Sequence, residues 1–231
     1  MDSRGKLFLV STPIGNYDDI TLRAISILNE VNIIICEEFK EARRLLSHFK
    51  IEKELVGLNE HNEEEASLEV FNKLKKGETA ALISDCGTPL FSDPGLLLVK
   101  MCIDAKIEVI PIPGASSIMA ALVGSGFSLD KFYYAGWLSP KSDLRIRELL
   151  RLKNIKELIV LMETPYRLKA ILSDIVKSFE PRINIVIGFD LTLPTEKFYR
   201  GTASELLNIA EEKKLKGEFV LVIDNSKGSR Q

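Results

Sequence analysis

Short apolar runs, each followed by a segment with helical spacing, limit the possible folds of this chain most strongly. Residues 7–10, 31–35 and 79–83 are apolar at nearly every position. Strands buried on both faces have this pattern, because helices cover both sides of a parallel sheet. The alternation of such strands with helices therefore predicts an α/β fold with a mostly parallel sheet.

The first half of the chain is expected to hold most of the parallel strands. Strands are predicted at residues 6–11, 31–35, 55–56, 79–83 and 107–110, and helices at 37–49, 64–76, 96–105 and from near 116. Another helix is expected after the first strand, because Ile20, Ala24 and Leu28 share one helical face. Asp18 or Asp19 is expected to cap that helix.

The second half continues this alternation. Strands are predicted at residues 132–136, 158–162, 183–187, 198–200 and 219–223, and helices at 143–153, 166–179 and 203–213. The later strands are expected to be partly antiparallel, because their connections are short. The polar tail, residues 225–231, is expected to fray.

The chain length of 231 residues fits one large domain or two small ones. Two prolines and a glycine within residues 111–114 favour a boundary near residues 112–116. The residues alone leave one continuous doubly wound sheet as an alternative.

Composition excludes several classes of protein. The net charge of -2 argues against a strongly basic nucleic-acid binder, although a local basic face stays possible. No apolar run approaches the roughly 18 residues of a membrane span, and the first residues lack a signal-peptide pattern. Cys36, Cys86 and Cys102 lack metal spacing and are expected to be reduced thiols in a cytoplasmic protein. With only two histidines, no metal site is expected.

Three loops that follow predicted strands are candidates for ligand binding: residues 12–16, 84–95 and 113–117. Ligands of parallel α/β sheets bind at the carboxyl ends of strands, where glycine allows close approach of the backbone. The helix start near Ser116 would suit a carboxylate. Each loop could instead be a simple turn. Because the dinucleotide fingerprint and the P-loop are both absent, dinucleotide enzymes and phosphate-cleaving motors are disfavoured.

Eight motifs occur in a fixed order along residues 7–224. They are Thr12-Pro13-Ile14-Gly15-Asn16, Leu45-Leu46-Ser47-His48-Phe49, Glu60-His61-Asn62-Glu63, Asp85-Cys86-Gly87-Thr88-Pro89, Asp93-Pro94-Gly95, Pro113-Gly114, Glu163-Thr164-Pro165-Tyr166-Arg167-Leu168 and Lys216-Gly217-Glu218. This series resembles the tetrapyrrole-methylase superfamily of S-adenosylmethionine-dependent methyltransferases. Within it, the chain is most similar to the bacterial family that methylates the ribose 2′-oxygen of a cytidine in 16S ribosomal RNA.

The resemblance implies two tandem α/β domains, residues 1–113 and 114–231, with the cofactor in the cleft between them and usually a homodimer. It also implies a set of cofactor-binding residues: Pro13, Gly15, Asp85, Gly87, Thr88, Pro89, Asp93, Gly95, Gly114, Ala115, Ser116, Ser117 and Met162. The loops are compatible with S-adenosylmethionine. Its ribose hydroxyls suit a carboxylate, its own carboxylate suits N–H donors, and it carries no phosphate that would need a P-loop.

The chain departs from the family pattern mainly at positions expected on the substrate side. The usual Glu-Asp-Thr-Arg reads Glu37-Glu38-Phe39-Lys40, and lysine lacks the bidentate fork of arginine. The usual Arg-Glu-Leu-Thr-Lys reads Phe-Asp-Leu-Thr-Leu at residues 189–193, and Cys86 replaces a usual alanine. If these positions contact RNA phosphate, binding is weakened. Methyl transfer is therefore better supported than the identity of the acceptor.

Glu37 is expected to be the catalytic base, because a ribose hydroxyl is a weak nucleophile. Its alternative role is to cap the helix that it begins. The expected substrate-binding residues are Asn16, Glu38, Lys40, His61, Arg167 and Asp190. Of these, Glu38, His61 and Asp190 are further candidates for the base. Arg167 could instead pair with Glu163, four residues earlier. The basic stretch at residues 141–156 is either an RNA-binding face or an ordinary helix surface.

Three functions stay open from the sequence. The first is ribosomal RNA 2′-O-methylation with S-adenosylmethionine, with the small ribosomal subunit as partner. The second is methylation of another RNA site, a tetrapyrrole or a protein by the same fold. The third is a non-catalytic binding protein, which binding of the cofactor would argue against.

Overall fold

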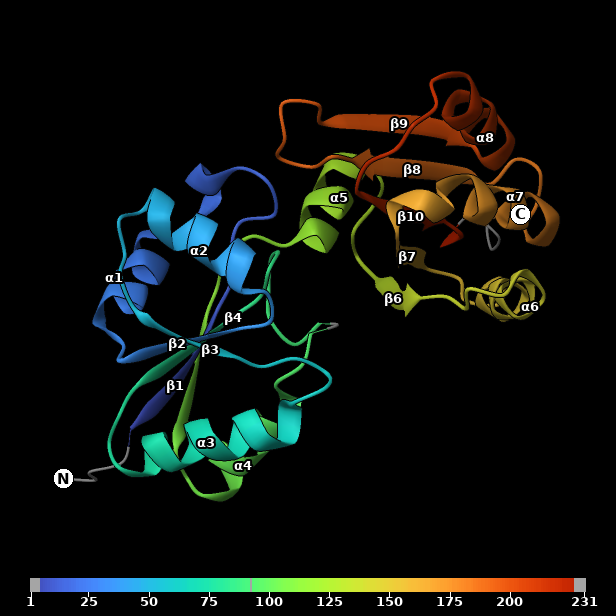
Figure 1. Ribbon diagram of the computed structural model, residues 1–231. Helices are drawn as coiled ribbons and strands as arrows, with labels where there is room; N and C mark the ends of the chain where they lie inside the picture. Colours follow the sequence, from blue (N-terminus) through green and yellow to red (C-terminus); the bar gives the residue numbers. More distant parts are fainter. Residues whose placement is uncertain (1–4, 92, 227–231) are drawn as a thin grey trace. The chain divides into compact units, whose positions relative to one another are not determined.

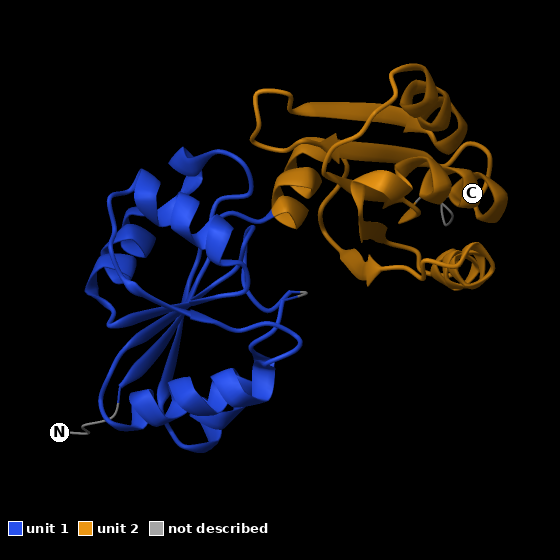
Figure 2. Cartoon of the chain, in the orientation of Figure 1, with its two compact units in different colours: residues 1–116 blue, residues 117–231 orange. Residues whose placement is uncertain are grey.

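The computed structural model describes residues 5–91 and 93–226. The chain divides into two compact units, residues 1–116 and 117–231 (Figure 2). Each unit has its own five-stranded sheet, so the alternative of one continuous sheet is wrong. The predicted α/β class with two tandem sheets is confirmed.

The sheet of the first unit is entirely parallel, with the strand order β3-β2-β4-β1-β5. Its strands are β1 (Lys6–Val10), β2 (Ile33–Cys36), β3 (Glu54–Gly57), β4 (Ala80–Ile83) and β5 (Glu108–Ile112). Its helices are α1 (Leu22–Glu30), α2 (Phe39–His48), α3 (Glu63–Lys75) and α4 (Leu96–Asp104). Helices α1 and α2 cover one face of the sheet, and α3 and α4 cover the other (Figure 1).

The continuous apolar strands of this unit feed two hydrophobic cores. In β2, Ile33 and Ile35 join the core under α3 and α4, whereas Ile34 and Cys36 join the core under α1 and α2. This two-sided burial explains why the strand has no polar position. Strand β5 continues through Pro111, which is tolerated because β5 lies at the edge of the sheet.

The predicted cap of the first helix is wrong. Asp18 and Asp19 lie in a 3-10 turn, Tyr17–Asp19, and α1 begins only at Leu22. The hydroxyl of Thr21 accepts a hydrogen bond of 3.1 Å from the backbone N–H of Ala24 and caps α1 instead. Thr21 stands three residues before that N–H, which is the spacing of an N-cap.

The sheet of the second unit is mixed, with the order β6-β7-β10-β8-β9. Its strands are β6 (Phe132–Trp137), β7 (Leu158–Glu163), β8 (Asn184–Phe189), β9 (Lys197–Thr202) and β10 (Phe219–Asp224). Its helices are α5 (Ser117–Ser125), α6 (Ser142–Leu152), α7 (Leu168–Ser178) and α8 (Ala203–Glu212). Strand β10 runs antiparallel to β7 and β8, and β9 runs antiparallel to β8. The expected antiparallel strands are thus confirmed.

Two expectations about termini of elements need adjustment. The helix predicted from Tyr166 begins at Leu168, because Pro165–Arg167 form a 3-10 turn. Of the tail, residues 227–231 lie outside the described residues, but Asn225 does not fray: its side-chain amide donates a hydrogen bond of 3.0 Å to the carbonyl of Lys153. Across residues 5–91 and 93–226, no helix has the length and apolar character needed to cross a membrane.

Candidate functional site

The three predicted ligand loops lie at the carboxyl ends of adjacent strands. Residues 12–16 follow β1, residues 84–95 follow β4 and residues 113–116 follow β5, and β1 lies between β4 and β5. Ser92 lies outside the described residues. Parallel strands place their carboxyl ends on one edge of the sheet, where α/β proteins bind ligands. The topology therefore brings these loops together in the first unit.

Hydrogen bonds tie the loops to one another. The backbone N–H of Thr12 donates to the carbonyl of Gly87 over 2.9 Å, and the Thr12 hydroxyl donates to the carbonyl of Ser84 over 2.9 Å. The hydroxyl of Thr88 donates to the carbonyl of Ala115 over 3.4 Å. The loops are thus pre-organised, which lowers the entropy cost of ordering them around a ligand.

Glycines allow the close approach of these loops. Gly87 has φ +86°, and a Cβ there would lie 3.2 Å from Cγ2 of Ile14. A Cβ at Gly114 would lie 2.8 Å from Cβ of Ser11. A larger residue at either position would push the loops apart.

Carboxylates gather where β2 and β4 end. The backbone N–H of Glu38 donates to Oδ1 of Asp85 over 3.3 Å. Burial raises the pKa of Asp85 above its ordinary value, and the charges of Glu38 and Asp93 raise it further, against that hydrogen bond. Burial also raises the pKa of Glu37, with added repulsion from Asp85 and Asp93. Such crowded carboxylates favour ligands that donate hydrogen bonds.

Asp93 provides a direct test of the fit to S-adenosylmethionine. Its Oδ2 is buried and has no hydrogen-bond partner among the residues that the structure describes. A buried carboxylate oxygen without a donor is unfavourable unless a ligand satisfies it. Within the same described ranges, no group of His, Cys, Asp and Glu side chains is arranged to hold a metal ion. Ribose hydroxyls are suitable donors, so the residues fit this cofactor.

Glu37 lies between β2 and α2 and is half-buried. Helix α2 begins at Phe39, with Glu38 in the N-cap position and no side-chain hydrogen bond at the cap. Glu37 therefore precedes the cap and does not begin the helix, which excludes its alternative role. Its carboxylate belongs to the acidic group beside Asp85.

The other predicted residues of the first unit differ in their surroundings. Asn16 accepts a hydrogen bond of 3.1 Å from the backbone N–H of Asp18 and caps the 3-10 turn. Lys40 is exposed on α2. His61 has a side chain that is 85% exposed, in a turn that follows β3. None of these contacts assigns a role in substrate binding, so those roles stay predictions.

In the second unit, the side chain of Arg167 forms its contacts within the protein. It forms an ion pair of 2.8 Å with Glu163, as the alternative interpretation expected. It also donates hydrogen bonds to the carbonyls of Leu138, over 3.0 Å, and Ser139, over 2.8 Å. Arg167 thus holds the segment after β6, and contact with a substrate stays a prediction.

The basic stretch at residues 141–156 is partly neutralised within the second unit. Arg145 is buried and pairs with Asp174 over 2.6 Å, and Lys153 pairs with Glu180 over 2.7 Å. The stretch therefore offers fewer available cations than its sequence suggests, which favours the ordinary helix surface.

The remaining predicted residues also have partners in the second unit. The Thr195 hydroxyl donates to Oδ2 of Asp190 over 2.9 Å, and the Tyr134 hydroxyl donates to Sδ of Met162 over 3.2 Å. Phe189, at a position where the family pattern has arginine, is buried in the hydrophobic core. It cannot contact RNA phosphate, whereas Leu193 is 37% exposed.

The sequence interpretation missed Glu63 as a functional residue. Its carboxylate accepts hydrogen bonds from the backbone N–H groups of Gly95, over 2.8 Å, and Leu97, over 3.4 Å. It thereby holds the Asp93–Gly95 segment. Its position in the Glu60–Glu63 motif was the available signal. None of Cys36, Cys86 and Cys102, all among the described residues, forms a disulfide with another, and their reduced state stays a prediction.

Comparison with known proteins identifies the family. The sequence profile described as Tetrapyrrole (Corrin/Porphyrin) Methylases matches residues 6–207. The chain belongs to this family. The predicted family is thus confirmed, and with it the assignment as an S-adenosylmethionine-dependent methyltransferase.

Two relatives with the name Ribosomal RNA small subunit methyltransferase I resemble this methylase over most of its length. The one from Synechocystis is 41% identical over 219 residues, covering 95% of this chain and 78% of the relative. The one from Thermotoga maritima is 39% identical over 219 residues, covering 95% and 98%. The resemblance to the ribosomal branch of the family is confirmed as well.

A solved structure supports the fold of the methylase independently. Uroporphyrin-III C-methyltransferase from Thermus thermophilus, complexed with S-adenosylhomocysteine, matches with a TM-score of 0.65 and 18% identity. The match covers 95% of this chain and 97% of that one. At this identity, the likeness concerns the fold.

Proposed function

We propose that this methylase transfers a methyl group from S-adenosylmethionine to the 2′-hydroxyl of a cytidine ribose in 16S ribosomal RNA. The observation that carries the proposal is the sequence identity of about 40% to relatives named as small-subunit ribosomal RNA methyltransferases, across nearly the whole chain. The joined loops of the first unit support it, because they retain the groups that this cofactor needs.

S-adenosylmethionine, when bound, supplies a methyl group activated by a positively charged sulfur. Asp85 and Asp93 would accept hydrogen bonds from its ribose hydroxyls. Backbone N–H groups of residues 114–116, which follow β5, would bind its carboxylate. The first loop, with Pro13 and Gly15, and the segment from Gly87 to Pro89 would form the apolar and backbone walls.

Glu37 is the proposed base. The proton of the ribose hydroxyl would move to a carboxylate oxygen of Glu37 as the oxygen becomes nucleophilic. Because burial and neighbouring carboxylates raise the pKa of Glu37, it is a stronger base than an ordinary glutamate. The rest of the catalytic effect is orientation of the reactants and exclusion of water.

The test uses tritium-labelled S-adenosylmethionine and small ribosomal subunits from bacteria that lack this methylation. Nuclease digestion of the RNA identifies the labelled nucleoside. Label in 2′-O-methylcytidine is expected. Absence of label from this nucleoside, with cofactor binding shown in the same preparation, would overturn the proposal. Transfer to another acceptor would then be favoured by the changed residues Phe39, Lys40 and Leu193.

Two finer features are proposed with this function. The first is a homodimer: Leu68 of α3 and Leu96 and Ile103 of α4 are each more than half exposed, although large and apolar. Light scattering in solution would test it, and a monomer mass at micromolar concentration would contradict it. The second is a cytoplasmic location, where small ribosomal subunits are made. A fluorescent fusion excluded from the cytoplasm would contradict it.

A further inference from the structure

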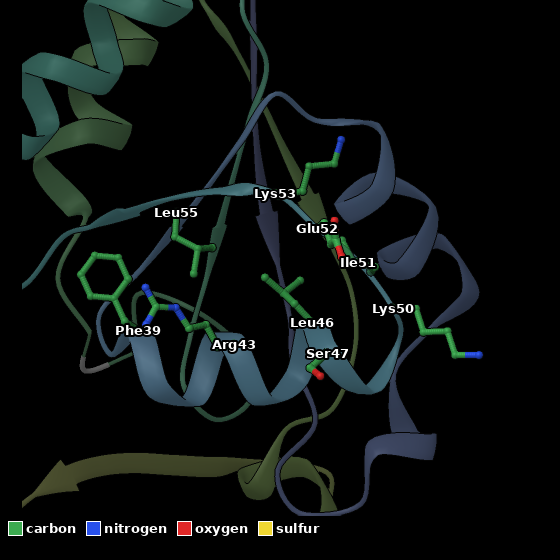
Figure 3. Close-up of a pocket in the computed structure, with 9 residues that line it drawn as sticks. All are labelled: Phe39, Arg43, Leu46, Ser47, Lys50, Ile51, Glu52, Lys53 and Leu55. Carbon is green, nitrogen blue, oxygen red and sulfur yellow. The ribbon is translucent and has the colours of Figure 1, made fainter.

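A groove follows the exposed side of α2. One hollow of about 640 Å³ lies between α2 and the segment that leads into β3 (Figure 3). A second, of about 950 Å³, lies beside it, between α2 and the 3-10 turn. The two hollows share Phe39, Arg43 and Ser47. We call this surface the α2 groove, and its main side chains are Tyr17, Phe39, Arg43, His48, Lys50 and Lys53.

The α2 groove is positively charged, although the whole chain has a net charge of -2. Two carboxylates, Glu38 and Glu52, line it, against five cationic side chains: Lys40, Arg43, Arg44, Lys50 and Lys53. Arg44 pairs with Glu41 over 2.9 Å. The other four have no ion-pair partner among residues 5–91 and 93–226. The groove is the local basic face that the net charge left open.

Aromatic rings line both hollows of the groove. Phe39 is 41% exposed, and the guanidinium of Arg43 lies 5.6 Å from its ring centroid (Figure 3). The edge of the ring lies over Gly57 of β3, where a Cβ would come within 2.8 Å of it. The ring centroids of Tyr17 and His48 lie 4.7 Å apart in the second hollow. Phe39 is thus held in position while part of its surface stays open.

Cations interleaved with exposed aromatic rings are the usual surface for single-stranded nucleic acid, because phosphates bind the cations and bases stack on the rings. The groove also begins close to the proposed base: Glu38, which lines it, directly follows Glu37 and donates its N–H to Asp85. A strand bound in the groove would therefore lead toward the carboxylates of the candidate site.

We propose that the α2 groove binds a single-stranded segment of the RNA substrate, with phosphates at Lys50 and Lys53 and a base stacked on Phe39. This inference rests on the proposed function for the identity of the RNA. It also gives Phe39 a role. The family pattern has an arginine at position 40, which would bind RNA through its charge, and stacking on the Phe39 ring replaces part of that contact here.

Fluorescence anisotropy with a labelled single-stranded RNA of about 12 nucleotides tests the groove directly. The variant Lys50→Glu/Lys53→Glu is expected to bind at least tenfold more weakly. The slope of the logarithm of the binding constant against the logarithm of the salt concentration is negative. Its magnitude should decrease by about 1.4 in this variant, because each phosphate contact to a single strand contributes about 0.7. The matched control, Lys131→Glu/Lys169→Glu, changes two exposed lysines of the second unit, one before β6 and one on α7. It should bind within about twofold of the unmodified protein.

Phe39 tests the stacking separately from the charge. Phe39→Ala should weaken binding about tenfold without changing the salt slope, and Phe39→Trp should keep binding, because indole also stacks on bases. Equal binding by the groove variants and the control would overturn the proposal. A groove variant that changes only the mass of the protein in light scattering would overturn it too, and would assign the groove to a second copy of the chain.

Two further measurements separate this inference from the proposed function. The thermal shift with S-adenosylhomocysteine should be equal in all variants, which shows that the cofactor loops are intact. If the unmodified protein fails to methylate small subunits but binds the single strand through Lys50 and Lys53, the proposed function fails and the groove stands. If it methylates subunits and the groove variants bind RNA normally, the groove fails and the function stands.

Discussion

The carboxylate of Glu63, in the first turn of α3, accepts a hydrogen bond of 2.8 Å from the backbone N–H of Gly95, directly before α4. Gly95 has φ +118°, and a Cβ there would lie 2.8 Å from a methyl carbon of Leu82. A carboxylate oxygen from α3 thus accepts hydrogen bonds from backbone N–H groups at the start of α4. These bonds hold the backbone next to Asp93. Asp93, whose Oδ2 has no hydrogen-bond partner among the described residues, lies two residues before Gly95.

Replacing Glu63 by alanine should therefore reduce both stability and cofactor affinity. Glu63→Ala leaves two N–H groups at the start of α4 without their acceptor, so the free energy of unfolding should fall by about 1 kcal/mol, as for other lost N-caps. Affinity for S-adenosylhomocysteine should fall roughly fivefold, because the Asp93–Gly95 segment is less ordered. Denaturant unfolding and calorimetry measure the two effects.

Two control variants give this prediction its specificity. Glu63→Gln keeps an acceptor oxygen and should retain most of the stability and affinity. Glu64→Ala removes the neighbouring, exposed carboxylate and should change neither quantity. A Glu63→Ala protein with unchanged affinity would show that this contact does not position the cofactor segment.

Asp85 should show opposed effects on stability and on binding. Burial and the charges of Glu38 and Asp93 raise its pKa, so its ionised form is unfavourable in the folded protein. Asp85→Asn removes that charge and keeps an oxygen that can accept the Glu38 N–H. At neutral pH, the variant should melt at a higher temperature than the unmodified protein, yet bind S-adenosylhomocysteine more weakly. Differential scanning fluorimetry with and without ligand tests both effects, and normal binding would exclude Asp85 from the cofactor site.

The pH dependence of stability follows from the same shifts. The ordinary pKa is 3.8 for Asp85 and 4.5 for Glu37, and both are raised in the folded protein. Above these values the folded state holds more protons than the unfolded state, so stability falls as the pH rises through the raised values. The melting temperature of Asp85→Asn should fall less than that of the unmodified protein between about pH 4 and pH 7. If the melting temperatures of the two proteins change equally with pH, the pKa of Asp85 is not raised.

Most of the fold could be predicted from the sequence, because the spacing of apolar residues along each segment matches the positions that are buried in its helix or strand. The strands at residues 33–36 and 80–83 are apolar on both faces and lie within the sheet. The start of α1 was misjudged, because two aspartates competed with Thr21 as the cap. Propensity ranks both residue types as good caps, and only the hydrogen bond from the N–H of Ala24 decides among the three residues.

The candidate site was predictable only as far as its backbone loops. Glycine and proline positions follow from local sequence, whereas the links from Thr12 to Gly87 and from Glu63 to Gly95 join segments far apart in the chain. Arg145 shows the same limit: it stands in a basic stretch, but its partner, Asp174, lies on another helix. The α2 groove likewise needs Gly57 of β3 beneath Phe39, which no spacing along the chain reveals.

The buried ion pair between Arg145 and Asp174 should be the most sensitive polar contact of the second unit. Burial raises the pKa of Asp174, but hydrogen bonds from Ser142, Arg145 and Lys177 outweigh it and lower that pKa below 3.8. Asp174→Ala leaves a buried guanidinium uncompensated, so the free energy of unfolding should fall by about 3–5 kcal/mol. The double variant Arg145→Met/Asp174→Leu should lose much less, because no charge stays buried. If the losses in unfolding free energy of the two single substitutions add up to the loss of the double variant, the two side chains are not energetically coupled. Denaturant unfolding measures these losses.

Gly57→Ala should disturb the α2 groove without changing any charge. The added Cβ would come within 2.8 Å of the Phe39 ring, so the ring must move. Overpacking of this kind destabilises by about 1–3 kcal/mol, and binding of single-stranded RNA should weaken about as much as in Phe39→Ala. In Gly57→Ala/Phe39→Ala the clash is gone, so RNA binding should equal that of Phe39→Ala alone, and part of the stability should return. If Gly57→Ala binds RNA normally although it is destabilised, the position of the ring does not govern RNA binding. Independent, additive losses in the double variant would show that position 57 affects RNA binding by a route other than Phe39.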